Sequence, residues 1–263
     1  KDIDGDGKID QYGFLDDRDL FEIAWAWGGD MFDPNVYEGY PPEKLALDEP
    51  ENYNALLTAL QERADLVHKH KVSPTPATQQ VIEQMGPPLK TGKVGMVIGG
   101  DWAIWGAMPK NYKWGIGAVP YSVPGVKRVC LYTDPLEIAR TSKYPDEAWE
   151  FVKYLVSPPV QKTFIEETGR VSSRPSLREE YIEEISSFIV NTEQELDQVL
   201  SGAFKYCQED AEHTVFGFYK LQFVWTSETD PLWLGKKGAK EVLDAMIVKV
   251  NQAIEENLRS IGK

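Results

Sequence analysis

The sequence is poor in the residues that cross-link a small fold or bind a metal. Its 263 residues include only two cysteines, Cys130 and Cys207, which can form at most one disulfide. The three histidines, His68, His70 and His213, are scattered and do not form a zinc-ligand pattern. These counts exclude a disulfide scaffold. The length of 263 residues suffices for one large domain or two small ones.

Long apolar runs and basic charge are also lacking. The most apolar stretch, residues 94–108, is interrupted by Asp101 and falls short of the ~20 residues that a membrane helix needs. Lys and Arg total 28 against 42 Asp and Glu, a net charge of −14. This balance disfavours phosphate-rich partners, so neither nucleic acid nor an anionic membrane is expected. We also expect no secretion signal or lipid anchor in this sequence.

Aromatic residues, by contrast, are abundant. Eight Trp, twelve Tyr and ten Phe make up 11% of a chain whose apolar and charged contents are ordinary for a folded protein. Hydrophobic periodicity predicts helices at residues 16–27, 52–71, 144–155, 160–168 and 238–258, and short apolar runs predict strands at 92–99, 114–119 and 129–139. Helices that alternate with a few short strands favour an α/β fold.

The acidic run at the start of the sequence has the spacing of a calcium-binding loop. Every second residue offers an oxygen, and Gly7 stands where an EF-hand loop turns sharply. Gly13 replaces the Glu that closes such a loop, so Asp16 or Asp17 would have to supply the last ligand. We expect a structural calcium ion, with a solvated acidic turn as the alternative. The expected ligands are the carboxylates of Asp2, Asp4, Asp6 and Asp10 and the carbonyl of Lys8.

Two segments place tryptophan beside paired glycines and an aspartate. The first contains Trp25, Trp27 and Asp30, and the second contains Asp101 and Trp102. A sugar presents apolar C–H faces and a rim of hydroxyls, so flat aromatic rings and nearby carboxylates suit it. Trp102 follows an expected strand end and a Gly-Gly turn, which is the usual ligand edge of an α/β sheet. The alternative is that the indoles of the first segment are core anchors.

An enzymatic function has little support in the sequence. A glycosidase needs two carboxylates on opposite sides of the scissile bond. Among 42 acidic residues some such pair can always be chosen, so its availability is no evidence for a glycosidase. Nucleophile-elbow and phosphate-loop motifs are not found. We therefore expect a binding protein and no catalytic residues, with a hydrolase ranking behind two binding functions.

Several motifs follow one another in a characteristic order and span nearly the whole chain. They are DIDGDGKIDQYGF (2–14), WAWGGDMFD (25–33), LKTGKVGMVIGGDWAIW (89–105), WGIGAVP (114–120), SKYPDEAWEFVKYLVSPPVQ (142–161) and TGRVSSRPS (168–176), followed by the terminal helix. This order resembles one protein family, the carbohydrate-binding branch of the extracellular solute-binding proteins of ABC transporters, which includes maltose-binding protein.

The resemblance implies an α/β fold of the periplasmic-binding-protein-like (type II) architecture. Such a receptor has two lobes, closes on its ligand by a hinge and releases the ligand unchanged. The matching motifs follow the first third of the family's chain, so the sequence is expected to lack that third. It would supply mainly the helix-rich C-terminal lobe, from residues 1–117 and 171–263. Residues 118–170 would cross the hinge and add a segment to the N-terminal lobe.

The resemblance also implies a function and a location. The ligand would be a sugar or oligosaccharide, delivered to the membrane subunits of an ABC importer from the periplasm or the extracellular space. The alternative is a calcium-dependent carbohydrate-recognition or scaffold module, whose Asp-rich loop contacts the ligand or a partner. Chelation of calcium would abolish binding by such a module while the protein stays folded.

Residue by residue, the resemblance assigns the family's ligand-stacking aromatic to Trp102. A second family aromatic precedes the terminal helix, where Phe223 and Trp225 are the candidates. The strand before the SK motif departs from the family's small-residue pattern, and Tyr132 is a candidate ligand residue there. Position and chemistry alone add Asp101, Trp25, Trp27 and Asp30.

Overall fold

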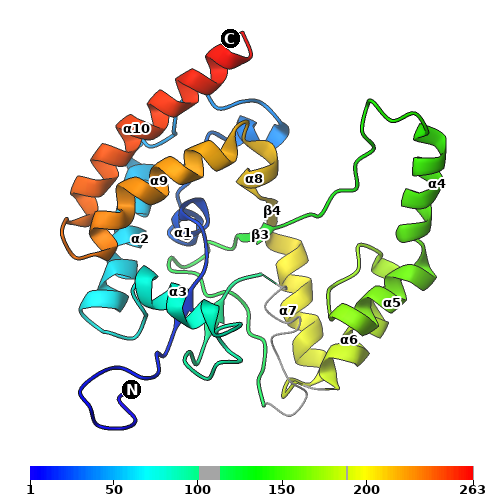
Figure 1. Cartoon of the computed structure of the whole chain (residues 1–263), viewed down its shortest axis with the longest axis horizontal. Coiled ribbons are helices and arrows are strands. Elements are labelled where there is room, and N and C mark those ends of the chain that lie inside the picture. The colour runs from blue at the N-terminus through cyan, green and yellow to red at the C-terminus, as the bar shows by residue number, and fades with distance from the viewer. Residues whose placement is uncertain (101–112, 188, 263) are drawn as a thin grey trace. The chain divides into compact units, whose positions relative to one another are not determined.

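The structure, a computed structural model, describes residues 1–100, 113–187 and 189–262. Its helices are α1 (Leu20–Ala26), α2 (Pro50–His68), α3 (Pro76–Gln84), α4 (Pro145–Leu155), α5 (Pro158–Thr168), α6 (Arg178–Ser186), α7 (Glu193–Tyr206), α8 (Ala211–Thr214), α9 (Phe218–Trp233) and α10 (Ala239–Ser260). The strands are β1 (Leu15–Asp16), β2 (Val97–Ile98), β3 (Val129–Leu131) and β4 (Cys207–Glu209). This is the helix-rich α/β fold that the sequence predicts (Figure 1).

The chain forms two compact units. Unit 1 comprises residues 1–98, 119–132 and 206–263, and unit 2 comprises the described residues of 99–118 and 133–205. The units do not follow the expected lobe boundaries, because residues 171–205 belong to the same unit as residues 133–170. Which lobe of a complete receptor each segment builds stays a prediction.

The main hydrophobic core lies in unit 1, where α10 packs along α9 and α1 packs against α2 (Figure 1). The terminal helix shows how the sequence directs this packing. Val242, Met246, Val250 and Ile254 recur at the spacing of one helix face, and each is at most 1% exposed. Burial of each such side chain contributes about 1.5–3 kcal/mol. The predicted apolar stripe of α10 is therefore confirmed.

Two parallel strand pairs complete unit 1. β1 pairs with β2 in the register Leu15↔Val97, and β3 pairs with β4 in the register Val129↔Cys207. Figure 1 shows β3 and β4 side by side, with α8 directly after β4. Parallel pairing brings the carboxyl ends of both strands in a pair to the same edge, which is where α/β proteins usually bind ligands.

Unit 2 has its own smaller core. The buried side chains come from α5, α6, α7 and the 3₁₀ turn Pro175–Leu177, and they are Ile165, Leu177, Tyr181, Ile182, Ile185 and Leu196. Among the residues that the structure describes, α4 contributes no fully buried side chain. Its aromatic side chains Trp149, Phe151 and Tyr154 are all more than half exposed.

The predicted strands are shorter than expected or absent. Of residues 92–99 only Val97–Ile98 form a strand, and of residues 129–139 only Val129–Leu131 do. The expected strand at 114–119 is wrong. The backbone N–H and carbonyl of Ile116, which a neighbouring strand would bond, are bonded instead by the side chain of Asn191. The Ile116 N–H donates to Asn191 Oδ1 at 2.7 Å, and the Asn191 amide donates to the Ile116 carbonyl at 3.1 Å.

The predicted helices are confirmed, with shifted ends. The first helix begins at Leu20 and not at residue 16, because Asp19 caps it. α5 begins at Pro158, so the two prolines start the helix, as their fixed φ favours. None of the described helices is both long enough and apolar enough to cross a membrane.

Candidate functional site

A group of polar side chains gathers in unit 1 where β1 and β3 end. We call this group the strand-end cluster. Asp16 ends β1, Tyr132 directly follows β3, and the others lie at the start of α1 or on α9. Its members are Asp16, Arg18, Asp19, Glu22, Tyr132 and Gln222.

Asp16 and Arg18 form a two-pronged ion pair. The Arg18 Nε and Nη2 groups donate to the two oxygens of Asp16, each at 2.8 Å. Asp16 is 8% exposed. Burial opposes its ionisation, but hydrogen bonds from Arg18 and the charge of Arg63 hold the pKa of this carboxyl below its ordinary value. Arg63 of α2 also donates to the carbonyls of Asp16 and Arg18, so the turn after β1 is held from two sides.

Asp19 and Glu22 close the N-terminus of α1 by a capping box. The Asp19 side chain accepts the backbone N–H of Glu22, and the Asp19 N–H donates to Glu22 Oε2 at 2.8 Å. The Leu20 N–H also donates to Asp19 Oδ1, at 2.6 Å. The second oxygen of Asp19 accepts a 2.6 Å hydrogen bond from the Gln222 side chain of α9. Burial raises the pKa of Asp19. The cap thus links the start of α1 to α9.

Glu22 joins α1 to the end of β3. The Tyr132 hydroxyl donates to Glu22 Oε2 at 2.9 Å, on the same oxygen that accepts the Asp19 N–H. Burial raises the pKa of Glu22 to about 7, against the lowering effect of these hydrogen bonds. Glu22 therefore changes its charge near neutral pH, unlike an exposed glutamate.

The strand-end cluster offers carboxylates, a phenol, an amide and a guanidinium within one region. These groups can both donate to and accept from the hydroxyls of a neutral ligand. Burial and cross-links between α1, α9 and β3 hold them in fixed positions, which lowers the entropy cost of binding.

Trp25 and Asp30 have a structural role that the sequence left open. Trp25 is 1% exposed, and its indole N–H donates to Asp30 Oδ2 at 2.9 Å. Asp30 also accepts the Tyr37 hydroxyl at 2.8 Å and pairs with Arg128 at 2.7 Å. The Arg128 guanidinium stacks 4.0 Å from the Trp25 ring centroid. In unit 1 this group ties the core together, and Trp27 packs against the same core.

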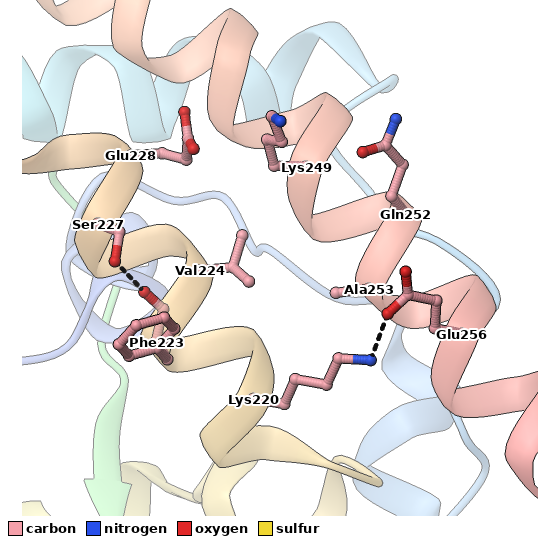
Figure 2. A pocket seen from close by; sticks show the side chains of 9 residues that line it. All are labelled: Lys220, Phe223, Val224, Ser227, Glu228, Lys249, Gln252, Ala253 and Glu256. Carbon is pink, nitrogen blue, oxygen red and sulfur yellow. Dashed lines mark hydrogen bonds and ion pairs between the residues drawn. The ribbon is translucent and has the colours of Figure 1, made fainter.

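The two aromatic candidates on α9 lie in different environments. Trp225 is 1% exposed and packs against Phe218 at a centroid distance of 5.3 Å. Phe223 is 74% exposed and lines a groove between α9 and α10 (Figure 2). An ion pair of 2.7 Å between Lys220 and Glu256 crosses this groove. Of the candidate residues that the structure describes, the groove contains only Phe223.

The structure brings part of the acidic loop together. Carboxylate oxygens of Asp2, Asp4 and Asp10 lie within 4.8 Å of one another. Asp6 instead accepts its own loop's Lys8 N–H at 2.8 Å and pairs with the Lys8 ammonium. Three carboxylates fit the oxygen preference of calcium, whereas Asp6 would have to turn to join them.

Trp102 and Asp101 lie outside the described residues. In sequence, Trp102 follows the end of β2 by four residues. β2 is the parallel partner of β1, which ends at the strand-end cluster. The predicted ligand role of Trp102 and Asp101 therefore rests on the sequence alone.

Sequence reasoning missed most of the strand-end cluster. Of its members only Tyr132 was a candidate for sugar binding, and Asp16 was considered only as a calcium ligand. Arg18, Asp19, Glu22 and Gln222 were not candidates. The Asp19–Glu22 spacing is a capping-box signal that marks the start of α1. Gln222 carries no comparable local signal, because its contact with Asp19 depends on the packing of α9.

Solved structures of several binding proteins are similar to this chain. An ABC substrate-binding protein, Lmo0181 of Listeria monocytogenes, in complex with cycloalternan, matches with a TM-score of 0.71 at 16% identity, over 95% of this chain and 60% of that one. The maltose/maltodextrin-binding domain MalE of Bdellovibrio bacteriovorus, bound to maltotriose, matches with a TM-score of 0.62 at 19% identity, over 97% and 63%. The GacH receptor of Streptomyces glaucescens, also solved with acarbose, matches with a TM-score of 0.62 at 19% identity, over 95% and 60%.

These comparisons give both the fold and the family. The chain spans about 60% of the length of the solved chains it matches. The model of the bacterial extracellular solute-binding protein family matches residues 5–162, more than half of the chain. This chain belongs to that family, as the resemblance in its motifs predicts. No curated protein matches it significantly.

Proposed function

We propose that this chain is part of a receptor that binds a sugar or oligosaccharide reversibly and delivers it to an ABC importer. The observation that carries the proposal is the strand-end cluster, a fixed set of hydrogen-bonding side chains at the carboxyl ends of β1 and β3. The family match and the sugars bound by the structural neighbours support it. The site of action would be outside the cytoplasmic membrane, as in the family.

In this proposal the cluster recognises hydroxyls and Trp102 supplies the stacking surface. Asp19, Glu22 and Tyr132 would bind the polar rim of the sugar, while the indole covers an apolar face. Asp101 would act beside Trp102. Trp25, Trp27, Asp30 and Trp225 would act indirectly, by keeping α1 and α9 in place.

Delivery requires two states that the transporter can distinguish. The chain passes between the two units four times, at residues 98–99, 118–119, 132–133 and 205–206. Several connections between the units suit a hinge that a ligand closes by shifting the open–closed population. Residues 118–170 would then add to the N-terminal lobe. The rest of that lobe would cover the exposed aromatic face of α4.

The acidic loop would have a structural role. We propose that Asp2, Asp4 and Asp10, with the Lys8 carbonyl and with Asp6 after a rotation, hold a calcium ion that stabilises the loop. The family match gives the alternative of a calcium-dependent recognition module no support.

Isothermal titration calorimetry of the chain with maltotriose, cycloalternan, acarbose and a panel of monosaccharides tests the proposal. Saturable binding of one sugar class, with the sugar recovered unchanged by mass spectrometry, supports it. Sustained release of shorter sugars would show a hydrolase. Folded protein that binds no sugar, even when joined to the rest of the receptor, would contradict it.

A further inference from the structure

The end of β4 runs directly into α8 and brings three metal-ligand side chains together. Figure 1 shows α8 following β4. Glu209 is the last residue of β4, Asp210 caps α8, and His213 lies within α8. One ligand atom from each side chain lies within 4.8 Å of the other two. An imidazole nitrogen with two carboxylate oxygens is a donor set that binds zinc and related transition metals.

Asp210 is the member of this group that most requires a cation. Its side chain is 0% exposed. Oδ1 accepts the His213 backbone N–H at 2.9 Å, but Oδ2 accepts no hydrogen bond. The atom that Oδ2 faces is His213 Nδ1, 2.8 Å away without hydrogen-bond geometry. A buried carboxylate oxygen without a hydrogen bond carries a desolvation cost that a bound cation would offset.

The spacing of the donor atoms suits a compact metal ion. His213 Nδ1 lies 2.8 Å from Asp210 Oδ2 and 3.6 Å from Glu209 Oε1. Ligand atoms bound tetrahedrally at ~2.0–2.1 Å from zinc lie ~3.3 Å apart, between these two distances. The Glu209 and His213 side chains are 32% and 33% exposed, so an ion can enter and water can complete its coordination.

We propose that Glu209, Asp210 and His213 form a structural site for a divalent transition metal, with zinc as its ion. The site would hold β4 in place beside β3, because the Asp210 N–H donates to the Leu131 carbonyl at 3.3 Å. The chain leaves unit 1 after Tyr132 and returns at Tyr206, next to these strands. The metal thus fixes the strand pair where the chain leaves and re-enters unit 1. This proposal does not depend on sugar binding.

Calorimetric titration of chelator-stripped protein with zinc chloride tests the site. The His213→Gln variant removes the imidazole, and His70→Gln is the matched control, since His70 is exposed on the helix-end segment far from β4 in sequence. We expect wild type and His70→Gln to bind one zinc ion and to gain thermal stability from it. We expect His213→Gln to bind at least about tenfold more weakly and to lose that gain.

Two further variants provide a test of a second ligand and a second control. Glu209→Gln replaces a partly exposed carboxylate ligand with a neutral amide at little risk to folding, so it should weaken zinc binding as well. Asp10→Asn alters the separate acidic loop and should leave zinc binding unchanged. Equal zinc affinity in wild type and His213→Gln would overturn the proposal, and so would a loss caused by Asp10→Asn or His70→Gln. Absence of saturable binding in the wild type would overturn it too.

Discussion

The Tyr132 hydroxyl donates a 2.9 Å hydrogen bond to Glu22, a residue 110 positions earlier in the chain. This contact ties the end of β3 to the first turn of α1. It also connects the last residue of a unit 1 segment to the helix that begins at the strand-end cluster. Glu22 is therefore hydrogen-bonded to the residue after which the chain leaves unit 1.

Stability should fall between mildly acidic and neutral pH because of Glu22. Burial raises its pKa from 4.5 to about 7, so the folded protein holds this proton more tightly than the unfolded chain. The resulting stabilisation is full below about pH 4.5 and is lost as the pH rises through about 7. A shift of about 2.5 units limits the effect to about 3 kcal/mol. Urea unfolding across this range measures it.

The Glu22→Gln variant should lose this pH dependence. Its amide stays neutral and its oxygen still accepts the Tyr132 hydroxyl, so the free energy of unfolding should be flatter from about pH 5 to about pH 8. Glu62→Gln on the exposed side of α2 is the control and should retain the wild-type profile. A wild-type profile in Glu22→Gln would show that another group causes the pH dependence.

Trp102→Ala should weaken sugar binding about 10- to 100-fold, because burial of an aromatic side chain contributes about 1.5–3 kcal/mol. Its fold stability should change little. Trp149→Ala, which removes an indole that is 53% exposed on α4, is the matched control and should bind as wild type does. Calorimetry with the preferred sugar gives both affinities. Unaltered affinity in Trp102→Ala would remove Trp102 from the proposed site.

The helices could be predicted from the sequence because their information is local. Periodic apolar residues mark α10, and Pro145 marks the start of α4, within their own residues. The strands could not be predicted as well, because pairing depends on a distant partner. Residues 114–119 have a strand-like composition, but Asn191 bonds to Ile116 in place of a neighbouring strand.

The candidate site was harder to predict for the same reason. An indole beside Gly-Gly and Asp suits either a ligand surface or a core. For Trp25 the outcome depends on Arg128, which stacks on its ring from a distant part of the chain. Glu22 has the sequence context of an ordinary first-turn acid, and only the contact with Tyr132 reveals its buried position.

Asp30→Ala should destabilise the protein by about 2–4 kcal/mol. The change leaves Arg128 without its carboxylate and removes the acceptor of Trp25 and Tyr37. Chemical unfolding by urea, followed by circular dichroism, measures the loss. Asp33→Ala is a useful comparison, since Asp33 only caps a short 3₁₀ turn and should cost about 1 kcal/mol. Unchanged stability with lost sugar binding would instead make Asp30 a ligand residue.

Calcium should raise the melting temperature of the wild type, and Asp10→Asn should reduce that rise most strongly. Asp10 lies in the cluster with Asp2 and Asp4, and its Oδ2 accepts the Ile3 N–H at 2.8 Å, so its position is fixed. Asp6→Asn should reduce the rise less, because Asp6 pairs with Lys8 outside that cluster. Stabilisation by a bound ion grows with its free concentration over its dissociation constant. Differential scanning calorimetry with calcium, with magnesium and with a chelator separates specific binding from charge screening. An equal response to both ions, or an unchanged response in Asp10→Asn, would show that the loop is only a solvated acidic turn.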